Sequence, residues 1–277
     1  MRQLIKLPAP SSNGNTGLQE INTELGWEYY KLFGVKTAGT PAITDFSNIQ
    51  PMVNNEAIWD NIDGQDLDEI NKADGLTPYS TNSVLMINFE SQKFIDGVPR
   101  MATTINTGVK SPKTGKIITN FGLKYTLGAA GAFDWWAEVE KSDPAGPGYI
   151  QRLEKKGDNT LIGVKQFDSL PYGEADVNHA QWRRIFMKVG AGNILTAALK
   201  LGSRYLMEPT LKAVMDQLLL DGGKTPGAYF DYTMDFTRYN MPEYLTVLGI
   251  AAKSLKLELN TDTATSVNFI VNSLGEI

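Results

Sequence analysis

Hydrophobic and polar residues alternate in several short stretches of the chain. In residues 121–127, aromatic and aliphatic side chains alternate with Gly122, Lys124 and Thr126. Leucine at every second position repeats this pattern in residues 255–260. Successive side chains of a β-strand point to opposite faces of a sheet, so these stretches predict strands with one buried face.

Aromatic and β-branched residues mark further strands in both halves of the chain. Two aromatic-rich stretches, residues 27–34 and 182–190, each end in glycine and lead into a turn. Such side chains favour the pleated, half-buried surface of a sheet. The other predicted strands are two apolar runs (43–49 and 194–201), two runs that follow a helix (84–89 and 229–236) and two closing strands (133–139 and 266–271).

One segment in each half has the spacing of a helix. In residues 210–220, apolar residues recur at positions i, i+3, i+4 and i+7, which predicts a single apolar face. That face consists of Leu211, Val214, Met215 and Leu218. Thr210 is the predicted N-cap and residues 221–223 the stop. The corresponding stretch of the first half is shorter and more acidic, with Ile62, Leu67 and Ile70 as its apolar positions.

The chain therefore carries a similar succession of elements twice. Asp74 and Phe89 have counterparts 147 positions later, in Asp221 and Phe236. Residues 141–148 hold two prolines and two glycines and separate the copies, and residues 149–160 are interpreted as a short helical bridge. We predict a first domain at 1–142, a linker at 143–160 and a second domain at 161–277.

Many short strands, few helices and frequent turns predict an all-β fold. Two consecutive sandwiches, each with a short inserted helix, narrow this fold to two tandem jelly-roll β-sandwiches, a double jelly roll. The agreement in spacing supports a repeat, although few residues are identical between the copies.

Composition narrows the classes of function. The 277 residues are 42% hydrophobic and 21% charged, which is enough for a packed core. The net charge is −5 and the pI is near 5.1. A nucleic-acid-binding protein needs clustered Lys and Arg to displace counterions from phosphates, so we expect no direct nucleic-acid binding.

Cysteine is absent, which excludes disulfides, thiolate catalysis and cysteine-based metal sites. No apolar run approaches the roughly 20 residues that a membrane-spanning helix needs. Residues 1–8 are too short and too polar for a signal peptide. These features predict a soluble protein that is made in a cytoplasm.

The candidates for catalysis are few. His179, the only histidine, is able to act as a general base or a metal ligand, but no second His or Cys is there to share a metal. We interpret it as an exposed histidine at a strand edge. Residues 222–225, Gly-Gly-Lys-Thr, resemble the end of a phosphate-binding loop, yet Leu218 stands where that motif needs glycine, and the segment leaves a helix. We interpret the segment as a helix stop and predict no catalytic or cofactor-binding residue.

The acidic run at residues 60–69 is the candidate metal site. An EF-type calcium loop with Gly64 in sixth place would put Trp59 first, and tryptophan does not ligate calcium. Two interpretations stay open: a looser surface site for structural calcium, and a solvated helix N-terminus that favours carboxylates. The metal-binding residues are therefore unknown.

Tryptophan side chains offer faces on which sugars stack. Trp135 and Trp136 are neighbours on a predicted strand and point to opposite faces, so at most one of them lies fully in a core. The other suits a subunit interface. Together with Trp27, Trp59 and Trp182 they are a candidate platform for glycan binding.

The element order of the second half resembles that of the major capsid proteins of membrane-containing icosahedral phages, above all the compact corticovirus type. The first half follows the same order more loosely, and it departs from it at the Gly/Ser/Asn-rich loop 11–17 and the long region 27–49. The resemblance rests on pattern and length, because the family has no catalytic signature. The matching segments are 170–171, 182–189, 210–220, 229–236, 244–251, 255–260 and 267–271.

The resemblance implies a structural protein of the virion rather than an enzyme. Its homotrimers would present six jelly rolls with a near-hexagonal outline and tile an icosahedral shell over an internal lipid membrane. The implied partners are neighbouring capsomers, penton and minor membrane-associated virion proteins and, indirectly, the membrane. Arg2 and Lys6 would meet anionic headgroups, a contribution of about 2 kcal/mol at most. Synthesis is expected in the cytoplasm of a bacterial host.

Two other classes of function stay open. One is a different virion component built from β-sandwiches, such as a minor capsid, spike or tail protein, which the copy number per particle would separate from a major coat protein. The other is a carbohydrate-binding module or a glycan-active enzyme, which glycan binding that depends on Trp135 or Trp136 would favour.

Overall fold

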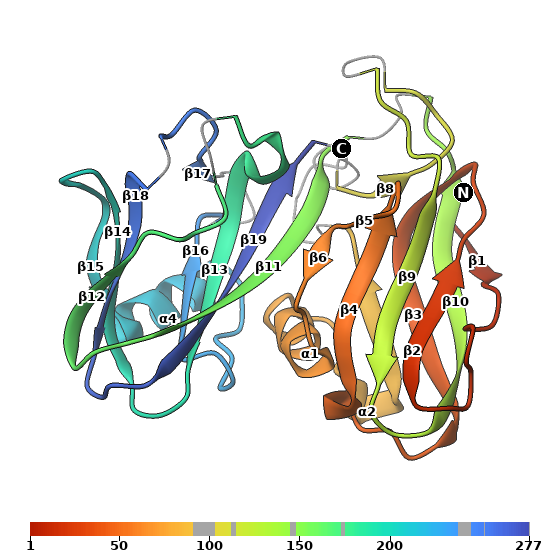
Figure 1. Cartoon of the computed structure of the whole chain (residues 1–277), viewed down its shortest axis with the longest axis horizontal. Helices are drawn as coiled ribbons and strands as arrows, with labels where there is room; N and C mark the ends of the chain where they lie inside the picture. The colour runs from red at the N-terminus through yellow and green to blue at the C-terminus, as the bar shows by residue number, and fades with distance from the viewer. Residues whose placement is uncertain are drawn as a thin grey trace. The chain divides into compact units, whose positions relative to one another are not determined.

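Two facing β-sheets form each half of the chain (Figure 1). The structure is a computed structural model that describes residues 1–90, 103–111, 115–144, 148–172, 175–237, 245–251 and 253–276. The chain divides into two compact units, Met1–Gln151 and Arg152–Glu276.

The described residues of the first unit form two sheets and three short helices. One sheet has the strand order β1-β10-β3-β7, with β8 also paired to β3, and the other has the order β2-β9-β4-β5. Their bounds are β1 Gln3–Lys6, β2 Gly17–Asn22, β3 Trp27–Gly39, β4 Phe46–Val53, β5 Glu56–Ala57, β7 Val84–Asn88, β8 Ile105–Asn106, β9 Phe121–Leu127 and β10 Gly131–Lys141. The remaining elements are η1 Ile43–Asp45, β6 Trp59–Asp60, α1 Gly64–Ala73 and α2 Tyr79–Asn82.

The second unit repeats this plan. One sheet has the order β16-β13-β19-β11, with β17 also paired to β13, and the other has the order β12-β18-β14-β15. Their bounds are β11 Ile150–Asn159, β12 Gly163–Phe167, β13 Gln181–Val189, β14 Ile194–Leu201, β15 Arg204–Leu211, β16 Tyr232–Asp235, β17 Leu245–Thr246, β18 Leu255–Thr261 and β19 Ser266–Gly275. The helices in its described residues are η2 Val177–His179 and α4 Lys212–Asp221.

Each sheet of the first unit has a counterpart with the same chain order in the second. Strands β1, β10, β3 and β7 correspond to β11, β19, β13 and β16, and strands β2, β9, β4 and β5 correspond to β12, β18, β14 and β15. The helices also correspond, because α1 packs against β7 and β4 while α4 packs against β16 and β14. The predicted all-β fold of two tandem jelly rolls is confirmed.

The spacing of the copies explains the repeat in the sequence. Helices α1 and α4 begin 148 positions apart, and so do β7 and β16, within one residue of the predicted offset. Strands β9 and β18 begin only 134 positions apart, at Phe121 and Leu255. The first unit therefore has the longer connection between the strand that follows its helix and its closing strands.

A β-bulge lies at the same place in both units. Lys31 pairs with Glu138 and Tyr29 with Val139, which leaves Tyr30 without a partner in the register. In the second unit, Arg184 pairs with Asn272 and Trp182 with Ser273, and the extra residue is Arg183. A bulge re-aims the side chain of the extra residue, and its recurrence supports a common plan for the two units.

The cores of the units differ in chemistry. In the first unit, Phe46 lies 5.1 Å from Phe133 and 5.8 Å from Tyr125 between ring centroids, and Tyr29 lies 4.9 Å from Phe121. The second core is mainly aliphatic: the leucines of β18 lie beside the aromatic pairs Phe167–Phe269 at 4.9 Å and Tyr172–Trp182 at 5.9 Å. Both cores bury the side chains that the alternating pattern assigned to one face.

Two local predictions are wrong. The segment expected as a helical bridge is strand β11, because pairing within a sheet overrides the helical preference of its charged residues. Thr210 is not the N-cap of α4: β15 continues to Leu211, which occupies that position. The predicted domains at 1–142 and 161–277 stay a prediction, and the compact units meet between Gln151 and Arg152.

The buried face of α4 agrees with the predicted one at Met215 and Leu218, which pack in or against the core, and differs at Leu211 and Val214. Met215 and Leu219 are 1% and 6% exposed, whereas Leu211 and Val214 are 58% and 49% exposed. The segment has apolar residues on nearly every side, so spacing alone left the buried face ambiguous. In α1 the predicted positions are correct, because Leu67 and Ile70 are buried.

Candidate functional site

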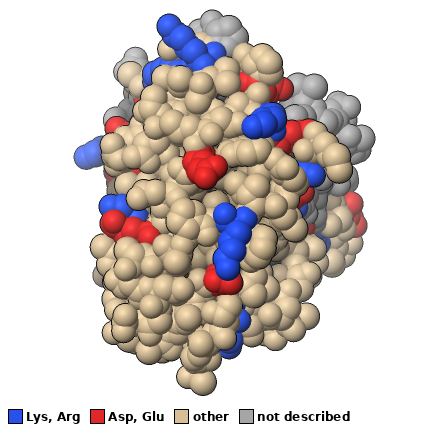
Figure 2. Space-filling view, turned by 90° about the vertical axis from the view of Figure 1, so that its right-hand side faces the viewer, with Lys and Arg blue, Asp and Glu red and all other residues tan. Residues whose placement is uncertain are grey.

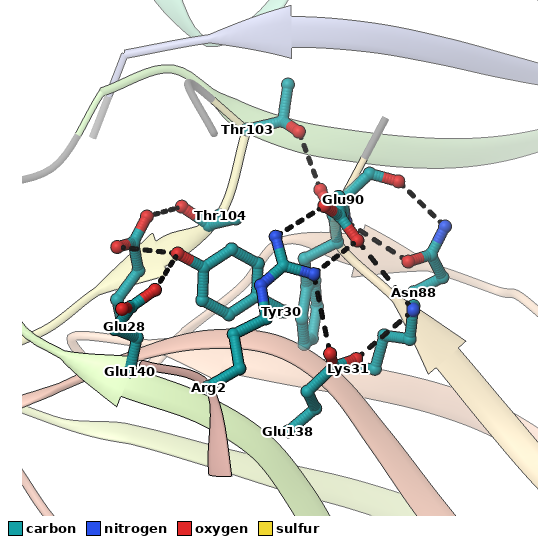
Figure 3. A network of polar contacts seen from close by, with 11 residues as sticks. Arg2, Glu28, Tyr30, Lys31, Asn88, Glu90, Thr103, Thr104, Glu138 and Glu140 are labelled. Carbon is teal, nitrogen blue, oxygen red and sulfur yellow. Dashed lines mark hydrogen bonds and ion pairs between the residues drawn. The ribbon is translucent and has the colours of Figure 1, made fainter. Parts of the chain in front are cut away.

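The outer face of the first unit's β1-β10-β3-β7 sheet carries a partly buried ionic cluster (Figure 3). Its members, here called the first ionic cluster, are Arg2, Lys31, Glu90 and Glu138. Arg2 donates to Glu90 Oε1 at 2.7 Å, and Lys31 Nζ lies 3.1 Å from Glu138 Oε2 and 3.7 Å from Glu90 Oε2. The Glu90 side chain is fully buried between the two cations.

The bulge at Tyr30 brings an aromatic ring into the same face. The Arg2 guanidinium carbon lies 3.8 Å from the centroid of the Tyr30 ring, a favourable cation–π geometry. The Tyr30 hydroxyl is 3.1 Å from Glu28 Oε2 and 3.3 Å from Glu140 Oε2. The hydroxyl of Thr104 donates to the other oxygen of Glu28. The network thus joins β3 and β10 to the segment around Thr104.

Burial controls the protonation of this network. Burial raises the pKa of Glu28, although hydrogen bonds from Thr104 and Tyr30 counteract it. Burial also raises the pKa of Tyr30, and the negative charge of Glu28 raises it further. Tyr30 therefore remains a neutral hydrogen-bond donor at physiological pH.

The second unit places an equivalent cluster on the outer face of its β16-β13-β19-β11 sheet. Its members, here called the second ionic cluster, are Arg184, Lys224, Asp235 and Thr237. Arg184 Nε lies 2.9 Å from Asp235 Oδ2, and Lys224 Nζ contacts the same oxygen. Lys224 also donates to the carbonyl and hydroxyl oxygens of Thr237 at 2.8 and 2.9 Å. The three charged side chains are 3–4% exposed.

Two cations hold Asp235 in its charged form. Burial alone would raise the pKa of this carboxyl, but the charges of Arg184 and Lys224 outweigh that effect and lower the pKa to about 2. Thr237 adds hydrogen bonds from its backbone amide at 2.7 Å and its hydroxyl at 2.8 Å. Every charge in this cluster has a counter-charge within contact distance, so the cluster fixes the sheet rather than offering a reactive group.

The structure places His179 differently from the prediction. Its side chain is only 17% exposed and lies between two carboxylates, Glu154 and Asp176. The interpretation as an exposed histidine at a strand edge is wrong, because η2 holds the imidazole against β11.

The carboxylates of the acidic run serve the helix α1. The amide of Asp63 lies 3.5 Å from Asp66 Oδ2, and Asp68 accepts the amide of Tyr79 at 2.7 Å. Lys72 pairs with Asp68 at 3.1 Å and with Glu69 at 2.7 Å. In the described part of the chain, no three His, Cys, Asp or Glu residues come together as a metal site would require. Structural calcium at residues 60–69 stays a prediction.

The remaining candidates have structural roles. Gly222 ends α4, as predicted, but Lys224 turns inward to the second ionic cluster. The candidate glycan platform does not form, because Trp59, Trp135 and Trp182 are buried. Trp136 points to the opposite face from Trp135 and is partly exposed, as the strand pattern predicted.

The basic residues near the N-terminus are engaged in ion pairs. Arg2 is part of the first ionic cluster, and Lys6 Nζ lies 2.8 Å from Asp134 Oδ2. The expected contact of these side chains with lipid headgroups would have to compete with these carboxylates.

Sequence reasoning missed both ionic clusters. The signal was present in charged residues inside otherwise apolar strands, such as Arg183 and Arg184 between Trp182 and Ile185. Lys and Arg are rarely buried without a counter-charge, so these positions indicated partners. The partners themselves lie 88 positions away for Arg2 and Glu90, too far for a local pattern to identify them.

The tandem sandwiches, with the same strand order and the same bulge, define the class of double jelly-roll proteins. Residues 158–277 match the model of a family described as viral coat protein P2 C-terminal domain. No curated protein sequence matches the chain.

Solved viral capsid structures share the fold over almost the whole chain. The major capsid protein P2 of bacteriophage PM2 superposes with a TM-score of 0.84 at 14% identity, over 99% of this chain and 97% of that one. A chain of Sulfolobus Turreted Icosahedral Virus gives 0.62 at 10% identity, over 99% and 90%. A chain of the PBCV-1 virus capsid gives 0.61 at 10% identity, over 99% and 93%.

These matches confirm the predicted resemblance to double jelly-roll capsid proteins. The family match covers residues 158–277, and the solved structures show the fold over 99% of the chain.

Proposed function

We propose that the chain is the major coat protein of an icosahedral virus and that it forms homotrimers that tile a shell over an internal lipid membrane. The observation that carries the proposal is the duplicated sandwich: one chain supplies two modules of identical strand order. Three chains around a threefold axis then supply six similar modules, which suits a near-hexagonal tile. Closed cyclic symmetry is the usual arrangement of such oligomers.

The proposed partners follow from this role. They are neighbouring capsomers, penton proteins and minor membrane-associated virion proteins. The membrane-associated proteins would lie between the shell and the membrane. The chain is acidic, with a net charge of −5. On the face shown in Figure 2, basic and acidic side chains are interspersed and form no continuous basic patch. These features support a coat that does not hold the genome directly.

The site of synthesis is part of the proposal. We place it in the cytoplasm of a bacterial host, on the strength of the resemblance to phage coat proteins. Within the described ranges, the helices are too short or too polar to cross a bilayer.

The alternatives have less support. Carbohydrate binding would need exposed aromatic faces, and three of the five tryptophans lie in the cores. A minor capsid, spike or tail protein would use the same fold. The copy number distinguishes it, because a major coat protein is the dominant band of purified virions.

Light scattering coupled to size-exclusion chromatography tests the trimer. The proposal predicts a particle of three times the chain mass of 30.5 kDa, stable on dilution into the micromolar range. A particle that remains monomeric at high concentration contradicts the proposal.

A further inference from the structure

Both ring nitrogens of His179 face carboxylate oxygens. Nδ1 lies 2.8 Å from Asp176 Oδ2, and Nε2 lies 3.1 Å from Glu154 Oε2. Asp176 precedes η2 by one residue, whereas Glu154 stands on β11. The imidazole therefore bridges a short helical turn and a strand of the sheet.

This geometry requires the charged form of the ring. Ionised carboxylates only accept hydrogen bonds, and a neutral imidazole has one N–H donor and one lone pair. With a neutral ring, one of the two contacts would set a lone pair against a carboxylate oxygen. With an imidazolium, both contacts become charge-assisted hydrogen bonds, which are shorter and stronger than neutral ones.

The bridge lies where several segments of the second unit meet. The carbonyl of Val177, in η2, accepts the amide of Glu276 at 2.9 Å, and the carbonyl of Ala180 accepts the amide of Val247 at 2.9 Å. The charged groups on these neighbouring elements are Asp176, Glu276 and, on β11, Arg152, Glu154, Lys155, Lys156 and Asp158. Lys156 pairs with Glu154 at 2.8 Å, and Arg152 Nη2 lies 3.5 Å from the carbonyl oxygen of Glu276.

We infer that His179 is a pH-dependent clamp of the second unit: as an imidazolium it ties residues 176–180 to β11, and as the pH rises it loses its proton and releases them. The clamp is independent of the proposed coat function, because it rests on contacts within one unit of one chain.

The sign of the pH dependence follows from both partners. Burial alone would lower the pKa of His179, but hydrogen bonds and charges from Glu154 and Asp176 raise it above its ordinary 6.5. The stabilisation is therefore complete below that value and disappears as the pH rises through the raised pKa. Burial would likewise raise the pKa of Glu154, yet His179 and Lys156 lower it below 4.5. The clamp consequently also opens when acid protonates Glu154.

Nuclear magnetic resonance tests the clamp without any substitution. His179 is the only histidine, so the native chain gives a single imidazole Cε1–H signal. Its titration midpoint is expected above 6.5. In the double variant E154Q/D176N the midpoint is expected to fall below 6.5, because burial then acts alone. In the matched control K156Q, which removes a neighbouring cation but no contact of His179, the midpoint is expected to stay above 6.5.

Hydrogen exchange tests the release. After correction for the intrinsic pH dependence of exchange, amides of residues 176–180 and the amide of Val247 are expected to lose protection across the midpoint. The loss should be about tenfold for each pKa unit by which the midpoint exceeds 6.5. H179Q should abolish this pH dependence. A midpoint at or below 6.5, or a raised midpoint without loss of protection, overturns the inference.

Discussion

The two units share their strand order and their bulge but neutralise a buried carboxylate with different parts of the chain. In the first unit, Glu90 lies between Lys31 of β3 and Arg2, next to the edge strand β1. In the second unit, Asp235 lies between Arg184 of β13 and Lys224, from the turn after α4. Lys31 and Arg184 hold the same place beside the bulge.

This comparison separates what the fold fixes from what it leaves open. The sheet order and bulge place one cation on the outer face in both units, whereas the second cation comes from whichever segment passes over that face. The first cluster is also less enclosed, because Arg2 is 31% exposed and Lys224 only 4%. We expect loss of the carboxylate to destabilise the second unit more than the first, because it would leave two buried cations without their anion.

The largest expected effect comes from removing the charge of the second cluster. D235N leaves Arg184 and Lys224 buried without their anion, and it should destabilise the second unit by about 3–5 kcal/mol. Urea unfolding followed by hydrogen-exchange mass spectrometry reports each unit separately. The control D216N removes an exposed pair with Lys212 on α4 and should cost about 0.5 kcal/mol or less. An equal loss of unfolding free energy in D235N and D216N would contradict the larger effect that is expected of the buried charge.

The second-largest expected effect is a difference between the two units in how much stability they lose at low pH. Asp235 has a pKa of about 2 in the fold against an ordinary 3.8, so its contribution of about 2 kcal/mol is present above 3.8 and disappears as the pH falls through about 2. Glu28 has the opposite sign: its raised pKa makes its contribution to stability increase as the pH falls towards 4.5. The second unit should therefore lose more protection in acid than the first. D235N should remove that difference, and its persistence in the variant would contradict the assignment to Asp235.

Removing the carboxylate of the first cluster should have a smaller effect than D235N. E90Q leaves Arg2 and Lys31 in contact with Glu138, so the expected cost is about 2 kcal/mol, the size of a lost charged hydrogen bond. The same unfolding measurement applies. If E90Q lowered the unfolding free energy of the first unit as much as D235N lowers that of the second, the exposure of Arg2 would make no difference to stability.

The smallest expected effect comes from a pair of core residues whose sizes differ between the two units. Gly34 pairs with Trp135 in the first unit, and Met187 pairs with Phe269 at the corresponding place in the second. A Cβ on Gly34 would lie 2.8 Å from the Trp135 ring. G34A should therefore destabilise the first unit by about 1–2 kcal/mol. In a W135F background the added cost of G34A should be smaller. If G34A destabilised the W135F variant as much as the native chain, the strain would not come from contact with the Trp135 ring.

The sequence predicted the elements of this fold better than their contacts. Alternation in β9 and β18 is a local property, and both strands form where it placed them. The buried face of α4 was predicted only in part: Met215 and Leu218 pack in or against the core, whereas Leu211 and Val214 stay exposed. Strand β11 was missed because its stability comes from pairing with β19, which no local pattern in its charged residues reveals.

For the candidate site, too, the sequence predicted local features but not long-range contacts. Gly222 was recognised as a helix stop from its type and position, but the inward turn of Lys224 depends on Asp235, eleven positions later. His179 was identified as the single imidazole, yet its partner Glu154 lies on a segment that the sequence assigned to a linker. Long-range partners are set by topology, and topology became visible only in the assembled sheets.

Cryo-electron microscopy of the purified particle tests the central claim most directly. The account predicts tiles of three chains around a threefold axis, each chain contributing two upright sandwiches of identical strand order. Tiles with another number of chains, or halves of the chain with unrelated strand connections, would contradict it.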